Sequence, residues 1–334
     1  MSLSQAVLNQ DRLALSRLLT RVENDSEEGR AALNELFPHT GKAHLIGVTG
    51  SPGTGKSTLV NQLALHYRKQ EKRVAIVAVD PSSPFTGGAV LGDRVRMRDL
   101  YGDPGVFIRS MASRGSLGGL AQTTAAVVRV FDAAGFDVIL IETVGAGQAE
   151  VDIARLAHTT LVVEAPGLGD DIQAIKAGIL EIADVLVINK ADRPGVENTE
   201  RALKGMLELA HPTRRVFQHH GQQMVVDAPE KVEEGHPIWV PEIKRVIAKD
   251  GVDIDKLAES IARHVAFLRE GDEWAARERA QLQSTFDTLI RETLFERFLD
   301  DLSAEGYDEI IAKMVNRDLS PWGAVEKLLE EDQV

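Results

Sequence analysis

The feature of this sequence that most limits the possible folds is a glycine-rich stretch between an apolar segment and a helical one. The apolar segment covers residues 44–49, and a helical run continues from Leu59 to Tyr67. Between them the chain reads Gly50-Ser51-Pro52-Gly53-Thr54-Gly55-Lys56-Ser57. A strand, the pattern G-x-x-x-x-G-K-[ST] and a helix in this order indicate a phosphate-binding loop, or P-loop. Backbone N–H groups and the helix N-terminus then face an anion.

The P-loop predicts how a nucleoside triphosphate is held. We expect the backbone of residues 50–58 to surround the phosphates and the hydroxyl of Ser57 to reach Mg²⁺. Lys56 is expected both to bind the outer phosphates and to assist catalysis. The alternative is a glycine-rich turn with a surface lysine, which the flanking strand and helix patterns disfavour.

Short apolar runs alternate with longer helical stretches beyond Gly41. The runs are 44–49, 74–80, 106–110, 138–142, 160–164 and 185–189, with a weaker candidate at 243–248. This alternation predicts an α/β fold, a P-loop NTPase with a mostly parallel sheet and helices on both faces. Ligands of such sheets bind at the carboxyl ends of the strands.

The chain divides into three predicted regions. Residues 1–40 form an N-terminal helical extension with two expected helices, 41–252 the P-loop domain, and 253–334 a C-terminal helical arm. Residues 212–235 lack periodicity and are expected to be a loop-rich connection. Ser320, next to Pro321, is expected to cap a last short helix. The arm packs on its own domain or buries its apolar stripe in a second subunit.

Composition excludes several classes of function. The net charge of -13 argues against nucleic-acid binding, which relies on a basic surface. The chain has no cysteine, so it has neither disulfides nor thiolate zinc sites. Its apolar runs are too short to cross a bilayer, and no signal peptide follows Met1. We therefore expect a cytoplasmic protein with no membrane partner.

The segment at 189–192 predicts which base is bound. It reads Asn189-Lys190-Ala191-Asp192 after an apolar strand and resembles the guanine-specificity motif of G proteins. A carboxylate at Asp192 can accept hydrogen bonds from guanine N1–H and from its exocyclic amine, whereas adenine offers no matching donor pair. Lys190 is expected over the base plane, and Asn189 is expected to tie this loop to the P-loop. The predicted substrate and product are GTP and GDP.

A second base contact is expected from a backbone N–H after a later strand. The candidates are Ile247, Ala248 and Lys249. The signal here is a single apolar run followed by a lysine.

Magnesium prefers hard oxygen ligands, so the sheet should supply carboxylates beside Ser57. Asp80 and Glu142 each end a predicted strand, and Asp93 lies in the loop that follows Asp80, after Gly87-Gly88. A helix N-cap or a solvated loop acid is the alternative for each. Glu142 begins a segment in the position of the usual Asp-x-x-Gly element, where the N–H of Gly145 can sense the γ-phosphate.

Longer strings extend the pattern over nearly the whole chain. They include Asp80-Pro81-Ser82-Ser83-Pro84-Phe85-Thr86-Gly87-Gly88, Gly92-Asp93-Arg94-Val95-Arg96-Met97, Glu142-Thr143-Val144-Gly145-Ala146-Gly147-Gln148 and Pro166-Gly167-Leu168-Gly169-Asp170. With the P-loop and the tetrad at Asn189, they resemble the methylmalonyl-CoA mutase-associated GTPases, the MeaB or ArgK family of the SIMIBI class.

The resemblance implies a G-protein chaperone of an adenosylcobalamin-dependent acyl-CoA mutase. Such a protein gates delivery of the intact cofactor and protects the mutase from inactivation, and the cobalamin belongs to the partner. The resemblance also implies a homodimer held partly by the C-terminal arm, with Asp80, Asp93 and Glu142 near magnesium. Ser116 and Ala149 depart from the family pattern, so a mutase acting on a different branched acyl-CoA fits as well.

Hydrolysis needs a positioned water and stabilisation of charge on the phosphates. Gln148 is the candidate that orients water. The basic candidates for the phosphates are Arg94, Arg96, Arg109, Arg114 and Lys176. Each of these is otherwise a solvated or structural ion-pair residue. We expect turnover that is slow alone and stimulated by the partner mutase.

Three other functions remain open at this point. A GTPase that inserts a metal into another enzyme usually carries Cys or His clusters, whereas this chain has only the adjacent pair His219 and His220. A P-loop kinase fits the phosphate loop but not the guanine tetrad. A nucleotide-binding module without hydrolysis is the third.

Overall fold

The computed structural model describes residues 2–81, 97–113, 119–143, 149–167, 182–210, 214–219, 222–227, 238–301 and 304–331. The chain forms two compact units, Met1–Leu282 and Gln283–Val334. None of the helices in the described ranges has the length and apolar character needed to cross a membrane.

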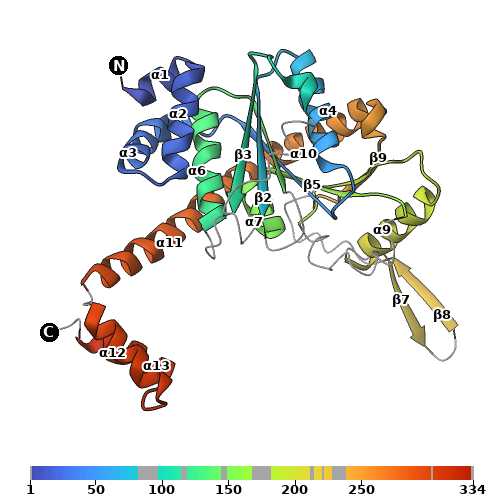
Figure 1. Ribbon diagram of the computed structural model, residues 1–334. Helices are drawn as coiled ribbons and strands as arrows, with labels where there is room; N and C mark the ends of the chain where they lie inside the picture. Colours follow the sequence, from blue (N-terminus) through green and yellow to red (C-terminus); the bar gives the residue numbers. More distant parts are fainter. Residues whose placement is uncertain are drawn as a thin grey trace. The chain divides into compact units, whose positions relative to one another are not determined.

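A seven-stranded parallel sheet forms the centre of the first unit (Figure 1). Its order is β3-β2-β4-β1-β5-β6-β9. The strands are β1 (His44–Thr49), β2 (Val74–Pro81), β3 (Val106–Ser113), β4 (Val138–Thr143), β5 (Thr159–Glu164), β6 (Val185–Ile188) and β9 (Glu242–Arg245). The sequence prediction of a parallel α/β sheet is confirmed, and the carboxyl ends of these strands lie along one edge.

Helices cover both faces of this sheet (Figure 1). On one face lie α4 (Lys56–Lys69) and α10 (Ile254–Glu270), whose apolar side chains pack in one cluster with alternate residues of β1, β2 and β4. On the other face lie α6 (Gly119–Ala133), α7 (Ala149–Leu156) and α9 (Val196–Ala210). Because side chains alternate along each strand, every second residue faces α4.

Three helices, not the two expected, precede the sheet. They are α1 (Leu3–Leu8), α2 (Arg12–Glu23) and α3 (Glu27–Leu36), followed by the 3-10 turn η1 (Phe37–His39). The break between the first two comes at Gln10, which has φ +64°, and Asp11 then caps α2. These helices pack against α6, and the Arg12 guanidinium donates to the carbonyl oxygen of Val106 at 2.8 Å.

The region expected to be a loop contains a hairpin. Its strands β7 (Arg214–His219) and β8 (Gln222–Asp227) pair antiparallel. The stretches from Val216 to Phe217 and from Met224 to Val226 supply the β-branched and aromatic residues that favour strands. Short 3-10 segments elsewhere in this unit include η2 (Arg98–Leu100) and η4 (Ala248–Asp250).

The first unit continues to Leu282, past the start of the predicted arm at residue 253. Helix α10 is part of the core, because Leu257, Ile261 and Leu268 are buried on its sheet side. Helix α11 (Glu273–Asp301) begins on the same unit, where Arg277 makes two hydrogen bonds, of 2.8 and 2.9 Å, to the carboxylate of Asp184. The arm therefore has its first turns fixed to the P-loop domain.

Asp184 also receives contacts from the sheet and from α10. Its Oδ2 accepts the backbone N–H of Thr160 at 2.7 Å, and Nε2 of His264 lies 3.2 Å from its Oδ1. Burial raises the pKa of Asp184, but the close approach of His264 and the hydrogen bonds from Arg277 outweigh burial and hold the pKa below its usual range. The carboxylate is thus ionised and shared by β5, α10 and α11.

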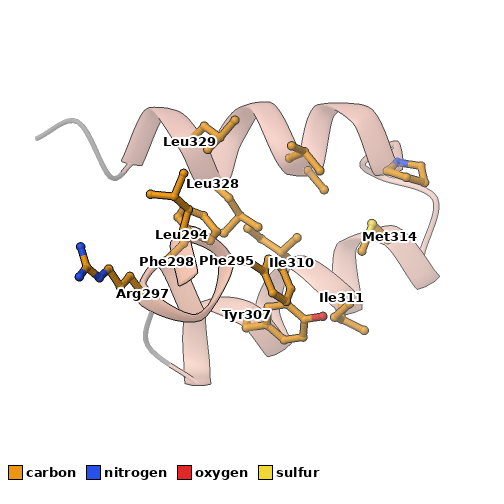
Figure 2. A pocket seen from close by; sticks show the side chains of 13 residues that line it. Leu294, Phe295, Arg297, Phe298, Tyr307, Ile310, Ile311, Met314, Leu328 and Leu329 are labelled. Atoms are coloured by element: carbon orange, nitrogen blue, oxygen red, sulfur yellow. The ribbon is translucent and has the colours of Figure 1, made fainter. Parts of the chain in front are cut away.

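The second unit contains the rest of α11 together with α12 (Ala304–Val315) and α13 (Pro321–Glu331). Ser320 caps α13 as the sequence predicted, its Oγ accepting the N–H of Gly323 at 3.1 Å. The three helices line an apolar pocket of about 750 Å³ that is partly open to solvent, and Figure 2 shows its lining side chains. Among them are Leu294, Phe298, Tyr307, Ile310 and Leu328.

Candidate nucleotide-binding site

The P-loop joins the carboxyl end of β1 to the first turn of α4. Gly50 adopts φ +132°, and a β-carbon there would lie 2.1 Å from the carbonyl oxygen of Val163 in β5. Gly55 adopts φ +95° immediately before the helix, and a β-carbon there would lie 2.5 Å from Nδ2 of Asn189. Both positions therefore need glycine, for backbone conformation and for space. The loop curls at the helix N-terminus, which favours an anion.

Lys56 lies at the first position of α4 and is largely buried. Its Nζ donates to the carbonyl oxygens of Gly50 at 2.5 Å and Ser51 at 3.1 Å. The side chain is thus folded across the loop that precedes it. A phosphate group bound to the loop would meet this ammonium group as a counter-charge. Thr54 stabilises the curl, since its hydroxyl donates to the Ser51 carbonyl at 2.9 Å.

Asn189 connects three segments of the site. Its Nδ2 donates to the carbonyl oxygen of Thr54 in the P-loop at 2.8 Å. Its Oδ1 accepts the backbone N–H of Lys190 at 2.8 Å and that of Ala248 at 2.9 Å. The residue is 3% exposed, and its bonds to Thr54 and Ala248 are buried. The sequence predicted the tie to the P-loop but carried no sign of the tie to Ala248.

Lys190 and Asp192 follow at the exposed end of β6. The Nζ of Lys190 donates to the carbonyl oxygen of Gly53 at 2.5 Å, so its aliphatic chain extends alongside the P-loop. Burial and the nearby Arg193 lower the pKa of Lys190, and Asp192 opposes them. Asp192 is exposed, as a carboxylate that receives a base must be before the base arrives.

The loop of residues 246–251 lies beside this segment, because Val246 exchanges backbone hydrogen bonds with Ile188 and Ala191. The N–H of Ile247 is bonded to Val252, and that of Ala248 to Asn189. Ile247 and Ala248 thus already use their N–H groups in bonds within the protein. Of the three residues expected to contact the base, Lys249 is therefore the candidate donor.

The strand ends bring together hard oxygen atoms of the kind that magnesium prefers. Glu142 is fully buried near the end of β4 and is paired in register with Val48 of β1, two residues before Gly50. Thr143 donates to Thr49 at 3.3 Å and joins the same two strand ends. The backbone of Asp80 lies two residues beyond Ala78, which pairs with Glu142. Carboxylates at these two strand ends, with the hydroxyl of Ser57 in the first turn of α4, are the kinds of oxygen donor that would fit Mg²⁺.

Several predicted site residues lie outside the described ranges. They are Asp93, Arg94, Arg96, Arg114, Gly145, Gln148 and Lys176. The side chain of Asp80 is likewise not described. Arg109, in contrast, is described and lies on the opposite face of the sheet. Its guanidinium makes two hydrogen bonds of 2.5 Å to Glu23 in α2, so it stabilises the N-terminal helices and does not reach the P-loop.

The side chains of His219 and His220 likewise lie outside the described residues. Elsewhere in the described ranges, no three histidine, aspartate or glutamate side chains gather to hold a metal ion.

Comparison with known proteins relates the chain to a family of GTPases. The family model described as methylmalonyl-CoA mutase-associated GTPase MeaB matches residues 15–303. A protein of Pyrococcus horikoshii named as a GTPase is 42% identical over 321 residues, covering 96% of this chain and 94% of that protein. The mouse mitochondrial methylmalonic aciduria type A homolog is 32% identical over 286 residues, covering 85% of this chain and 64% of that protein.

Solved structures give the same relationship at the level of the fold. The crystal structure of a LAO/AO transport system kinase is 25% identical and superposes with a TM-score of 0.68. The match covers 99% of this chain and 97% of that chain.

Proposed function

The chain belongs to the MeaB family of methylmalonyl-CoA mutase-associated GTPases, and from this membership we propose that its GTP hydrolysis gates cofactor loading of a partner mutase. The chain is a P-loop GTPase, like the relatives that it matches over most of its length. The partner is an adenosylcobalamin-dependent acyl-CoA mutase, which acquires the intact cofactor and is protected from inactivation. The family match over residues 15–303 carries this proposal.

We propose that the P-loop backbone from Gly50 to Thr58 surrounds the phosphates, with Lys56 as their counter-charge. Asp192 accepts hydrogen bonds from guanine, and Lys190 covers the base. Asn189 holds the P-loop and the base-reading loop in fixed positions relative to each other. The backbone around Lys249 supplies the second base contact. The hydrogen bonds of Asn189, which tie the base-reading loop to the P-loop and to Ala248, support this division of roles.

Magnesium is held by Ser57 and by the carboxylates of Asp80, Asp93 and Glu142. When bound, the ion supplies positive charge that neutralises the phosphate oxygens in the transition state. Gly145 senses the γ-phosphate through its N–H, Gln148 orients the attacking water, and Arg94 and Lys176 approach the phosphates. The buried carboxylate of Glu142 supports this assignment, because a buried acid is stabilised by a cation.

The test of the proposed function combines association and rate. GTP hydrolysis is measured for the isolated chain and with a candidate mutase, in the presence and absence of adenosylcobalamin. We expect the mutase to raise the rate and the Lys56→Ala variant to lose this stimulation. Equal rates with and without every candidate mutase would contradict the chaperone role, while leaving the GTPase activity itself intact.

We also propose a homodimer held by the C-terminal arm. Its α11 helix exposes large apolar side chains, among them Phe286, Leu294 and Phe295, each about 60% exposed. Exposed apolar surface of this extent marks an interaction site. Light scattering should give a dimer for the native chain and a monomer for the double variant Phe286→Glu, Leu294→Glu. Ser284→Glu, a polar exposed position in the same helix, is the matched control and should remain dimeric.

A further inference from the structure

Two buried polar atoms near the proposed magnesium site have no hydrogen-bond partner in the described part of the chain. One is Oδ1 of Asn61 in α4, a residue that is 4% exposed, and the other is Oγ of Ser110 in β3. Buried polar groups in proteins are almost always bonded to protein, to water or to an ion. Each of these two atoms therefore needs a specific explanation.

The strand register places Ser110 in a row with Glu142. Ser110 pairs with Ala78 of β2, and Ala78 pairs with Glu142 of β4. In β3, Val106 and Ile108 pack into the cluster on the α4 face, so Ser110 faces α4 by alternation. Val138 and Leu140 place Glu142 on the same face. The small side chain of Ala78 lies between the hydroxyl and the carboxylate.

Helical spacing places Asn61 over the same part of the sheet. Ser57, Asn61 and Arg68 are spaced by four and seven residues, so they lie on one side of α4. The Arg68 guanidinium makes two hydrogen bonds of 2.9 Å to Asp103, shortly before β3 begins. This side of the helix therefore faces the β2 and β3 end of the sheet. Asn61 lies one turn beyond Ser57, between the P-loop serine and the row formed by Ser110 and Glu142.

The chemistry of the two atoms selects their ligand. The unused atom of Asn61 can only accept a hydrogen bond, and the hydroxyl oxygen of Ser110 can accept one as well. Magnesium in proteins keeps several water ligands, and each of them is a strong donor. Of the proposed metal ligands, Glu142 lies on the same face of the sheet as Ser110, and Ser57 lies one turn before Asn61 in α4.

We propose that Asn61 and Ser110 are positioning residues that accept hydrogen bonds from the water ligands of the magnesium ion. They thereby set the Mg²⁺ concentration that the bound nucleotide requires. The inference rests on the magnesium site given under the proposed function. It concerns no direct contact with GTP, so the nucleotide's affinity without metal should not depend on either side chain.

The test measures how tightly magnesium joins the protein–GDP complex. A fluorescent GDP analogue is bound in EDTA, and the Mg²⁺ concentration that gives half of the maximal slowing of its release is determined. We expect Asn61→Leu and Ser110→Ala each to raise this concentration about tenfold, as loss of one hydrogen bond worth about 1.4 kcal/mol would do. Affinity for the analogue in EDTA should remain as in the wild type.

Two further variants separate positioning from a purely structural role. Asn61→Asp keeps an acceptor oxygen at the same place and should restore at least the wild-type magnesium response. Thr124→Val is the matched control, because Oγ1 of Thr124 is also buried without a partner among the described residues, in α6 on the opposite face. It should leave the magnesium response unchanged, whatever it does to thermal stability.

The outcomes distinguish this inference from the site on which it rests. A wild-type response to magnesium that persists unchanged in both Asn61→Leu and Ser110→Ala would overturn the inference and leave the magnesium site standing. Release of the analogue that does not depend on magnesium in the wild type would overturn the proposed site itself. An equal effect of Thr124→Val would identify the change as general destabilisation and would also overturn the inference.

Discussion

The side-chain amide of Asn189 donates a hydrogen bond of 2.8 Å to the carbonyl oxygen of Thr54, across 135 residues of sequence. This bond ties the loop that follows β6 to the P-loop. The same side chain accepts the N–H groups of Lys190 and Ala248 through its oxygen. One buried residue thus fixes the positions of the phosphate-binding loop, the base-reading loop and the segment at 246–251 relative to one another.

Replacing Asn189 with alanine should weaken nucleotide binding more than it unfolds the protein. The change leaves the buried N–H of Ala248 and carbonyl of Thr54 without partners, at a cost of about 1 to 3 kcal/mol. Because the P-loop and the base-reading loop are then no longer held together by these hydrogen bonds, affinity for GDP should fall roughly tenfold to a hundredfold. Titration with a fluorescent GDP analogue measures the affinity, and thermal unfolding measures the stability.

Asn198→Ala is the control for this variant, since Asn198 is exposed in α9. It should leave both quantities close to those of the wild type. If Asn189→Ala bound GDP with wild-type affinity, the loop-positioning role would be wrong.

Substituting Asp192 with asparagine should change which base is bound. The carboxylate accepts from the N1–H and the exocyclic amine of guanine, whereas an amide presents one acceptor and one donor. Xanthine carries an oxygen in place of the amine, which suits that amide. We expect affinity for GDP to fall about a hundredfold, or about 2.7 kcal/mol, and affinity for xanthosine diphosphate to rise. Competition binding with both nucleotides checks this, and an unchanged preference for GDP would contradict the assigned role.

Local patterns in the sequence predicted most of the fold and the phosphate loop. The buried parallel strands are short apolar runs rich in β-branched residues, and the run at 185–188 ends directly at the tetrad. The strand order and the contacts of Asp184 could not be predicted, because they join segments far apart in sequence. Arg277 lies 93 residues from Asp184. The proposed role of Asn61 could not be predicted either, because in the sequence it is one polar residue within a helix. Its position over Ser110 and Glu142 follows only from the register of β2, β3 and β4.

Arg277→Ala should destabilise the first unit. Asp184 is buried, with a side chain 9% exposed, and would lose two hydrogen bonds from the guanidinium. Removing one partner of a buried ion pair costs about 3 to 5 kcal/mol, and the partial exposure of Arg277 reduces this to about 2 kcal/mol. Urea unfolding at pH 7 measures the change in the free energy of unfolding.

Arg279→Ala serves as the matched control, because Arg279 lies two residues further along α11 and is exposed. Its free energy of unfolding should stay within about 0.5 kcal/mol of the wild type. Comparable losses in the two variants would show that the ion pair with Asp184 contributes nothing specific.

Acidification should destabilise the protein through His158, which stacks on Trp274 with ring centroids 3.9 Å apart. Burial, reinforced by Arg277 and Arg269, lowers the pKa of His158 to about 3. Below pH 6.5 the unfolded chain therefore binds a proton that the folded chain refuses, and stability falls as the pH drops. Between pH 7 and pH 5 this residue alone should remove about 2 kcal/mol from the free energy of unfolding.

His158→Asn should reduce that acid sensitivity, although it lowers stability at pH 7 through the lost stacking. Asparagine does not titrate, and its oxygen can accept the Leu45 N–H that His158 Nδ1 accepts at 3.1 Å. Urea unfolding at pH 7, 6 and 5 gives the slope for each variant. His39→Asn, at an exposed position before the sheet, should keep the wild-type slope. A His158→Asn protein that loses as much stability on acidification as the wild type would show that this buried ring is not the source.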